Sequence, residues 1–147
     1  MSELFAVSLN QDIRRGRHVV YLLHAHLVFV TKRRGAVFSA QHLNRLETIF
    51  DRVCTAAGAE LVEFNGESDH VHLLVHFPPT TRLSDLINSL KGVSSRKIKQ
   101  EFPEIATFWS VRKSRNVLWS PSYFVGSVGG APLEVLKEYI EQQDRPD

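Results

Sequence analysis

The alternation of apolar and polar positions along the chain has two periods, and each predicts a type of secondary structure. The predicted helices cover residues 39–57, 83–102 and 132–143, and the predicted strands cover residues 19–31, 59–64, 70–77 and 117–128. Ser39 supplies an N-cap for the first helix, and Gly58 ends it. Pro132 suits the first turn of the last helix.

The predicted order of elements is β-α-β-β-α-β-α. Its first six elements match the ferredoxin-like pattern, an α+β fold with two helices on one face of an antiparallel sheet. We expect the additional C-terminal helix to pack on the other face of the sheet or on a partner subunit. Asn65-Gly66 is expected to form a turn, and residues 105–116 give no clear pattern. With no repeat or linker, residues 1–147 form one predicted domain, with 1–18 as an N-terminal arm.

Composition excludes several classes of protein. A chain of 147 residues with 43% hydrophobic and 23% charged residues can bury the core of one ordinary domain. No apolar run is long enough to span a bilayer, and the first residues lack the features of a signal peptide. The one cysteine, Cys54, excludes an internal disulfide framework and favours a reducing, cytoplasmic location.

The net charge of +2 conceals a strong segregation of charge along the chain. Residues 14–34 carry six basic residues and no acid, and residues 82–115 carry eight basic residues against three acids. Residues 47–69 carry six acids and one basic residue, and residues 116–147 carry five acids and two basic residues. Clustered helix faces in water would be one explanation, but two long basic stretches favour a nucleic-acid partner.

A pair of histidines, His70 and His72, lies on the strand predicted for residues 70–77. Alternate side chains of a strand share a face, with Cα atoms about 6.6 Å apart, so both imidazoles can approach one divalent metal ion. Spacing alone leaves open a metal half-site or two histidines on a half-exposed strand. His76 lies about 20 Å from His70 along a strand, too far to share the metal.

A second pair, His24 and His26, lies on the first predicted strand, and we expect packing or hydrogen bonding there rather than metal binding. Either residue, like His76, could still line the site.

Two residues of the predicted C-terminal helix, Tyr139 and Gln143, lie four apart and therefore share one helix face. A tyrosine near a divalent cation can act as a covalent nucleophile on a phosphodiester. Packing on an amphipathic helix is the alternative role for this tyrosine.

Four blocks of the chain, in order, and its opening strand resemble the single-tyrosine HUH transposases of insertion sequences. The block around His70-Val71-His72 resembles their His-hydrophobic-His signature. The opening strand from His26 and the segments 91–96, 118–124 and 138–143 resemble their other blocks, so the resemblance covers residues 21–143. The chain departs from the family at Lys32-Arg33-Arg34, often Lys-Tyr-Arg, and at Ser68, often proline.

The resemblance implies a role for particular residues of the family's active site. His70, His72 and Gln143 match the metal ligands for Mg²⁺ or Mn²⁺, and Tyr139 matches the nucleophile that forms a 5′-phosphotyrosine. It also implies binding of hairpins at insertion-sequence ends, cleavage and rejoining of single-stranded DNA, and a homodimer whose active sites are shared between subunits. A domesticated relative that processes genomic hairpins, or a non-catalytic hairpin-binding regulator, is the alternative.

Candidate DNA contacts come from both basic stretches. Lys32, Arg33, Arg34, Lys91 and Arg96 are the expected phosphate-binding residues, although the helix residues among them also suit a solvated face. Trp119, Tyr123 and Phe124 are candidates for stacking on unpaired bases. For Phe124 core packing is the stronger expectation, and alternation places Tyr123 on the other face. Asp69 is either a turn residue or a carboxylate that orients a ligand.

Overall fold

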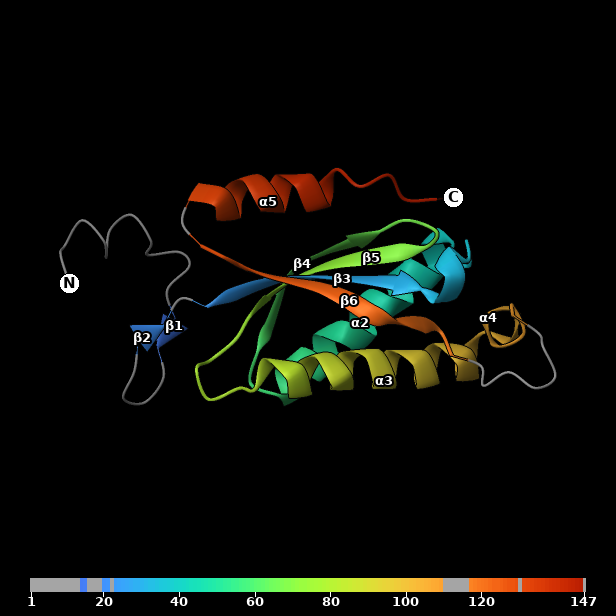
Figure 1. Ribbon diagram of the computed structural model, residues 1–147, viewed down its shortest axis with the longest axis horizontal. Coiled ribbons are helices and arrows are strands. Elements are labelled where there is room, and N and C mark those ends of the chain that lie inside the picture. The colour runs from blue at the N-terminus through green and yellow to red at the C-terminus, as the bar shows by residue number, and fades with distance from the viewer. Residues whose placement is uncertain (1–13, 16–19, 22, 110–116, 130, 147) are drawn as a thin grey trace.

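The computed structural model describes residues 14–15, 20–21, 23–109, 117–129 and 131–146 (Figure 1). The elements in chain order are β1 Arg14–Arg15, β2 Val20–Tyr21, β3 His24–Thr31, the 3₁₀ helix η1 Lys32–Arg34, α2 Ala40–Ala56, β4 Glu60–Gly66, β5 His70–His76, α3 Leu83–Glu101, α4 Pro103–Ala106, β6 Trp119–Val128 and α5 Ala131–Glu141. Most of the expected N-terminal arm and the basic residues Arg17, Arg112, Lys113 and Arg115 lie outside the described residues.

Four strands form the main sheet in the order β4-β5-β3-β6, and every neighbouring pair is antiparallel. Helices α2 and α3 cover one face of this sheet, and α5 lies across the other face (Figure 1). The predicted ferredoxin-like α+β fold is therefore confirmed. The C-terminal helix packs on the sheet of its own chain, which is the first of the two positions expected for it.

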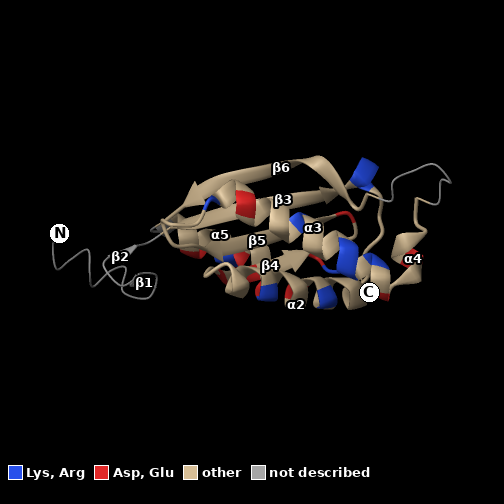
Figure 2. Cartoon of the chain, turned by 90° about the horizontal axis from the view of Figure 1, so that it is seen from below, with Lys and Arg blue, Asp and Glu red and all other residues tan. Residues whose placement is uncertain are grey.

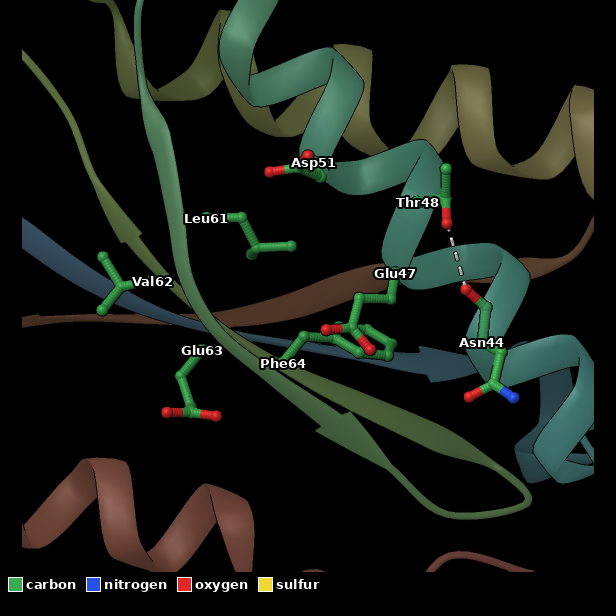
Figure 3. Close-up of a pocket in the computed structure, with 8 residues that line it drawn as sticks. All are labelled: Asn44, Glu47, Thr48, Asp51, Leu61, Val62, Glu63 and Phe64. Atoms are coloured by element: carbon green, nitrogen blue, oxygen red, sulfur yellow. Dashed lines mark hydrogen bonds between the residues drawn. The ribbon is translucent and has the colours of Figure 1, made fainter.

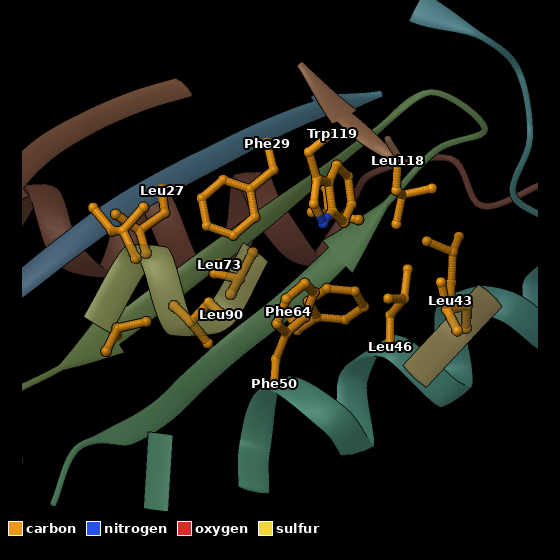
Figure 4. Close-up of a cluster of buried hydrophobic side chains, with 14 of the residues drawn as sticks. Leu27, Phe29, Leu43, Leu46, Phe50, Phe64, Leu73, Leu90, Leu118 and Trp119 are labelled. Carbon is orange, nitrogen blue, oxygen red and sulfur yellow. The ribbon is translucent and has the colours of Figure 1, made fainter. Parts of the chain in front are cut away.

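The main core fills the space between the sheet and the helices α2 and α3 (Figure 4). Leu27 and Phe29 of β3 and Leu73 of β5 point into it and are fully buried. Phe50 of α2 and Leu90 of α3 meet them from the other side. Because strand side chains alternate between faces, the intervening residues of β3 and β5 face α5 instead.

Helix α2 begins as the sequence predicts. Ser39 is its N-cap, and Ser39 and His42 form a capping box in which the Ser39 backbone N–H donates to Nδ1 of His42 at 3.0 Å. Such a cap satisfies backbone N–H groups that the first helical turn leaves without partners. Gly58, at φ +76, ends the segment in the left-handed region that glycine adopts readily.

The expected turn at Asn65-Gly66 is wrong, because both residues belong to β4, opposite His72 and Val71 of β5. A Cβ atom at Gly66 would lie 2.6 Å from the carbonyl oxygen of His70, so the close approach of the strands requires glycine there. The chain turns after Gly66, where the Glu67 N–H donates to that same carbonyl at 2.9 Å. The local turn signal was overridden by strand pairing.

The long strand expected over residues 19–31 is divided. Val20–Tyr21 pairs with Arg14–Arg15 in a separate two-stranded sheet, and β3 begins only at His24. A continuous apolar run cannot reveal that its two parts pair with different partners.

Residues 110–116 lie outside the described part of the chain, and Pro103–Ala106 forms the short helix α4. Within the described residues, no helix has both the length and the apolar character needed to cross a membrane.

Candidate active site

His70 and His72 project from the face of β5 that α5 covers. Their ring centroids lie 5.0 Å apart at nearly a right angle, so the two imidazoles converge on one place as the strand period predicts. His76 shares this face but packs against His24, with ring centroids 4.5 Å apart, away from His70. The structure thus places His24 with His76 in a second histidine cluster, apart from His70 and His72.

Helix α5 brings Tyr139 and Gln143 to the same place. The ring of Tyr139 lies 5.6 Å from that of His72, edge to face, and half of its surface is exposed, open to a substrate. Gln143 lies just beyond the end of α5 rather than within it, and its side chain hydrogen-bonds His72. Its Nε2 also donates to the Tyr139 carbonyl at 3.4 Å. Residues 67 or more positions apart in sequence therefore meet within one chain.

Two kinds of contact hold α5 on the sheet. Leu133 and Ile140 are fully buried against Leu74 of β5, a small apolar cluster separate from the main core. Beyond the helix, Nδ2 of Asn65 donates to the carbonyl oxygens of Glu141 and Gln143, at 3.2 and 3.3 Å. These contacts fix the segment that carries Tyr139 and Gln143.

Arg145 completes this anchor at the C-terminal end. Its guanidinium donates to the side-chain oxygens of Asn65 and Asn44, the latter at 2.7 Å, and lies 3.3 Å from a Glu47 carboxylate oxygen. The sequence showed no sign of this role for Asn65 and Arg145, because it depends on contacts across about 80 residues of chain.

Asp69 holds the first histidine. Its Oδ1 lies 2.8 Å from Nδ1 of His70, and its Oδ2 lies 3.4 Å from the Arg34 guanidinium. Burial alone would raise the pKa of the Asp69 carboxyl, but the hydrogen bond and charge of His70, together with Arg34, outweigh it and hold the pKa below its usual value. A carboxylate on the far nitrogen of a ligand histidine fixes the ring and makes it a better donor. Of the two roles expected for Asp69, the contacts favour orienting the ligand.

His26 holds the second histidine. Its Nε2 lies 3.0 Å from Nδ1 of His72, a contact that places this strand histidine in the lining of the site. Burial lowers the pKa of His72 to about 4, with further contributions from the nearby rings of His70 and His26. Burial also lowers the pKa of His26. Both rings are therefore neutral near pH 7, the state in which imidazole binds metal ions.

The residues present fit a divalent cation with mixed nitrogen and oxygen ligands. The Nδ1 atoms of His70 and His72 are engaged by Asp69 and His26, so a shared ligand would bind their Nε2 atoms, on the side where the Gln143 amide hydrogen-bonds His72. Gln143 adds an amide oxygen beside them. No group of three or more histidine, cysteine, aspartate or glutamate side chains in the described part of the chain could hold a metal.

Comparison with known proteins identifies the family. The family model for IS200-like transposases matches residues 19–143. The ISDra2 transposase TnpA of Deinococcus radiodurans is 30% identical over 138 residues, which cover 93% of this chain and 95% of the relative.

The chain belongs to the IS200-like transposase family. The transposase of insertion sequence IS200 from Salmonella typhimurium is 26% identical over 122 residues, 83% of this chain and 77% of that one. A crystal structure of a Deinococcus radiodurans R1 protein described as a transposase superimposes with a TM-score of 0.70 at 32% identity, covering 90% of this chain and 98% of the other.

A REP-associated tyrosine transposase bound to a REP hairpin shares the fold, with a TM-score of 0.59 at 11% identity over 86% of this chain and 69% of that chain. Membership of the family identifies this chain as a transposase, a protein of DNA transposition.

Basic residues of this transposase gather where β3 ends and η1 follows (Figure 2). Arg33 and Arg34 both have left-handed backbone conformations, at φ 55 and 54, which cost roughly 1–2 kcal/mol each in a non-glycine residue. The hydroxyl of Thr31 braces this turn by donating to the Gly35 carbonyl at 2.8 Å. Strained backbone of this kind is typical of functional sites, and here it directs Arg34 towards Asp69.

Beside this turn lies a groove of about 510 Å³ with a mostly apolar lining. Lys32 and Lys91 contribute to its walls, and Trp119 to its lining. The Lys91 ammonium donates to the Ser120 carbonyl at 2.9 Å and lies 5.1 Å from the centre of the Tyr123 ring, so it also joins α3 to β6. Arg96 lies farther along α3 and is exposed.

The aromatic residues of β6 differ from expectation. Trp119 is buried in the main core, where its indole N–H donates to Ser94 at 2.9 Å, and with 3% of its surface exposed it has almost no ring surface for stacking. Phe124, expected in the core, is 54% exposed on the histidine face and packs edge-on against His26. Tyr123 lies on the opposite face, as alternation predicts. Position on an edge strand, which the sequence does not give, accounts for the exposure of Phe124.

A second groove, of about 500 Å³, lies between α2 and β4 (Figure 3). Its lining includes the carboxylates of Glu47, Asp51 and Glu63. Burial and the nearby charge of Glu141 raise the pKa of Glu63. This concentration of acid repels a phosphate backbone, so the groove is no candidate for binding DNA.

Proposed function

We propose that this transposase cleaves and rejoins single-stranded DNA with Tyr139 as the nucleophile. The observation that carries the proposal is the convergence of Tyr139 and Gln143 on His72, beside His70, on one face of the sheet. The resemblance of these four residues to the active site of single-tyrosine transposases agrees with that arrangement.

In the proposed reaction the phenolic oxygen of Tyr139 attacks the phosphorus of a phosphodiester. A bond forms between that oxygen and phosphorus, the bond to the 3′ oxygen breaks, and the phenolic proton is lost while the 3′ oxygen gains one. The product is a 5′-phosphotyrosine and a free 3′-hydroxyl. Since the phosphoester bond is conserved, a 3′-hydroxyl of another end can reverse the step and join the strands.

His70, His72 and Gln143 would hold a divalent ion, Mg²⁺ or Mn²⁺. When bound, such an ion polarises the scissile phosphate and offsets the charge that develops on it. Asp69 orients His70 for this role, and the neutral state of His72 leaves a lone pair for it.

The proposed substrate is a hairpin at an insertion-sequence end, with phosphates held by Lys32, Arg33, Arg34, Lys91 and Arg96. Lys32, Arg33 and Arg34 form the basic turn, and Lys32 and Lys91 line the groove beside it. The related REP-associated transposase was solved with a REP hairpin, which supports this class of substrate.

We further propose a homodimer that shares its active sites between subunits. The outer side of α5 and the edge strand β6 expose apolar side chains, among them Val135 at 68%, Phe124 at 54% and Val125 at 43%. Apolar surface of this kind commonly marks a protein interface.

The experiment incubates the protein with labelled single-stranded DNA that carries the element's end, in the presence of Mg²⁺. A covalent protein–DNA adduct should form and should be absent with Tyr139→Phe. An adduct of undiminished yield in that variant would refute the assignment of Tyr139. His70→Ala should abolish the adduct and leave hairpin binding largely intact. Hairpin binding by the unaltered protein with no adduct would instead indicate a non-catalytic regulator.

A further inference from the structure

His26 contacts a proposed metal ligand but is not among the residues that the resemblance assigns as metal ligands or nucleophile. It lies on β3 opposite Leu74 of β5, and thus diagonally from His72 on the same face of the sheet. We propose that His26 is a positioning residue, which accepts a hydrogen bond from Nδ1–H of His72 and so reserves the Nε2 lone pair of His72 for the metal. This inference rests on the proposed metal site.

The geometry of the two rings is that of an in-plane hydrogen bond. Nε2 of His26 and Nδ1 of His72 are 3.0 Å apart, and the ring planes differ by 17°. The centroids are 5.3 Å apart, about the largest separation that a 3.0 Å contact between ring nitrogens allows. The rings therefore lie edge to edge, and the line between the nitrogens follows the direction of a ring N–H and lone pair.

In the proposed arrangement this contact sets which nitrogen of His72 carries the lone pair. A neutral imidazole has one N–H and one lone pair, and a metal takes the lone pair. If His72 binds through Nε2, its proton is on Nδ1, and His26 must present a lone pair to it. Without an acceptor there, His72 can place its proton on Nε2, where the Gln143 amide accepts it and the proton competes with the metal.

The surroundings hold His26 in this orientation. The Phe124 ring packs edge-on against His26, with centroids 5.5 Å apart. It lies over Gly126, the β6 residue opposite His26, where an added Cβ would be 3.0 Å from that ring. On the neighbouring ligand, Asp69 engages Nδ1 of His70 in the corresponding way. Both ligand histidines thus have a partner on the nitrogen away from the metal.

The first test needs neither metal nor DNA. Long-range ¹H–¹⁵N NMR on the folded, metal-free protein reports the tautomer of His72. We expect the proton on Nδ1 in the unaltered protein, a shift towards Nε2–H in His26→Phe, and recovery in His26→Gln. Gln places an acceptor oxygen as many bonds from Cβ as Nε2 of histidine. An unchanged tautomer in His26→Phe would overturn the proposal.

The second test measures Mn²⁺ binding through the loss of the free-ion EPR signal. Removing a partner of a ligand histidine weakens metal binding by about 10–100-fold, so we expect that loss in His26→Phe and near-normal affinity in His26→Gln. Equal losses of affinity in both variants would show that the imidazole acts by packing, which contradicts the proposal. Unchanged affinity in His26→Phe would contradict it as well.

A matched control and a reference variant separate this inference from the proposed function. His24→Phe changes a histidine two residues earlier on the same strand face, which packs on His76 instead, and should bind Mn²⁺ normally. His70→Ala and His72→Ala should each bind Mn²⁺ much more weakly than the unaltered protein. If these bind Mn²⁺ equally, the proposed metal site is wrong, and the NMR comparison still decides whether His26 sets the tautomer.

Discussion

His72 lies where burial and its neighbours disfavour a positive charge on its ring. Only 6% of the residue is exposed, and the rings of His70 and His26 lie beside it. Burial is the largest cause of the lowered pKa of about 4, and the hydrogen bond that the Gln143 side chain accepts from His72 opposes it only in part. The ring that the proposed metal needs as a neutral donor is thereby kept neutral in the absence of any metal.

This residue makes the stability of the metal-free protein depend on pH. Between about pH 6.5 and pH 4 the unfolded chain binds a proton at His72 and the folded chain does not, so lowering the pH through this window favours unfolding. The shift corresponds to a loss of about 3 kcal/mol. Urea unfolding at pH 7 and pH 4.5 should show a smaller loss of stability in His72→Gln than in the unaltered protein. Equal losses would contradict the assigned pKa.

At the scale of the elements, α5 is the helix on whose position the proposed reaction depends most. A small apolar cluster holds its inner face, and Arg145 and Asn65 hold its C-terminal end. The Arg145 side chain is 29% exposed and contacts residues of α2 and β4. It therefore ties the segment around Gln143 to elements far from it in the sequence.

Replacing Arg145 should loosen this end of α5. In Arg145→Ala we expect faster hydrogen exchange of the last backbone amides of α5 and less adduct, because Gln143 and Tyr139 are held less firmly, with hairpin binding retained. Arg52→Ala, at an exposed arginine of α2, should leave exchange in α5 unchanged. Unaltered exchange in Arg145→Ala would mean that the apolar cluster alone holds the helix.

The pattern of apolar residues predicted the elements themselves well, because each depends on its own period and caps. The helix over residues 39–57 and the strand over residues 70–77 are confirmed with small changes at their ends. The pattern could not predict features that depend on how the strands pair. These are the place of Asn65 within β4, the exposure of Phe124 on an edge strand, and the contact between His26 and His72. The convergence of His70 with His72 needed only strand alternation, whereas the approach of Tyr139 needed the tertiary fold.

At the scale of the whole molecule, charge separates by region. The basic turn of η1 lies at the end of β3, and the acidic groove lies between α2 and β4 (Figures 2 and 3). A phosphate backbone is thus attracted to one region of the surface and repelled from another.

Hairpin binding should accordingly weaken steeply with salt, because phosphate contacts release counterions. Arg33→Ala should weaken binding and reduce the slope of log affinity against log salt by about 1, the value for one phosphate contact. Titrations at several salt concentrations measure this, with Arg52→Ala as the matched arginine control. A slope that Arg33→Ala leaves unchanged would remove the basic turn from the proposed interface.

The active site can be completed by its own chain or by a partner subunit. Within the single chain Tyr139 lies beside its own His72, so one chain holds every proposed catalytic group. The apolar attachment of α5 is small, however: in the described part of the chain Leu133 and Ile140 are fully buried against Leu74, with Val62, Val128 and Leu136 partly buried around them. A helix held by so few apolar contacts can dock in the same way on the sheet of a second copy.

A mixing experiment separates the two arrangements. One variant carries His70→Ala and His72→Ala, and the other carries Tyr139→Phe; neither should form an adduct alone. If the sites are shared between subunits, one site of the mixed dimer combines intact histidines from one subunit with Tyr139 from the other. We therefore expect each mixed dimer to have one active site. Adduct should then appear on the chain that retains Tyr139, which a size tag identifies. If co-expressed and co-purified mixed dimers form no adduct while unaltered dimers do, each chain completes its own site, and the proposed sharing is wrong.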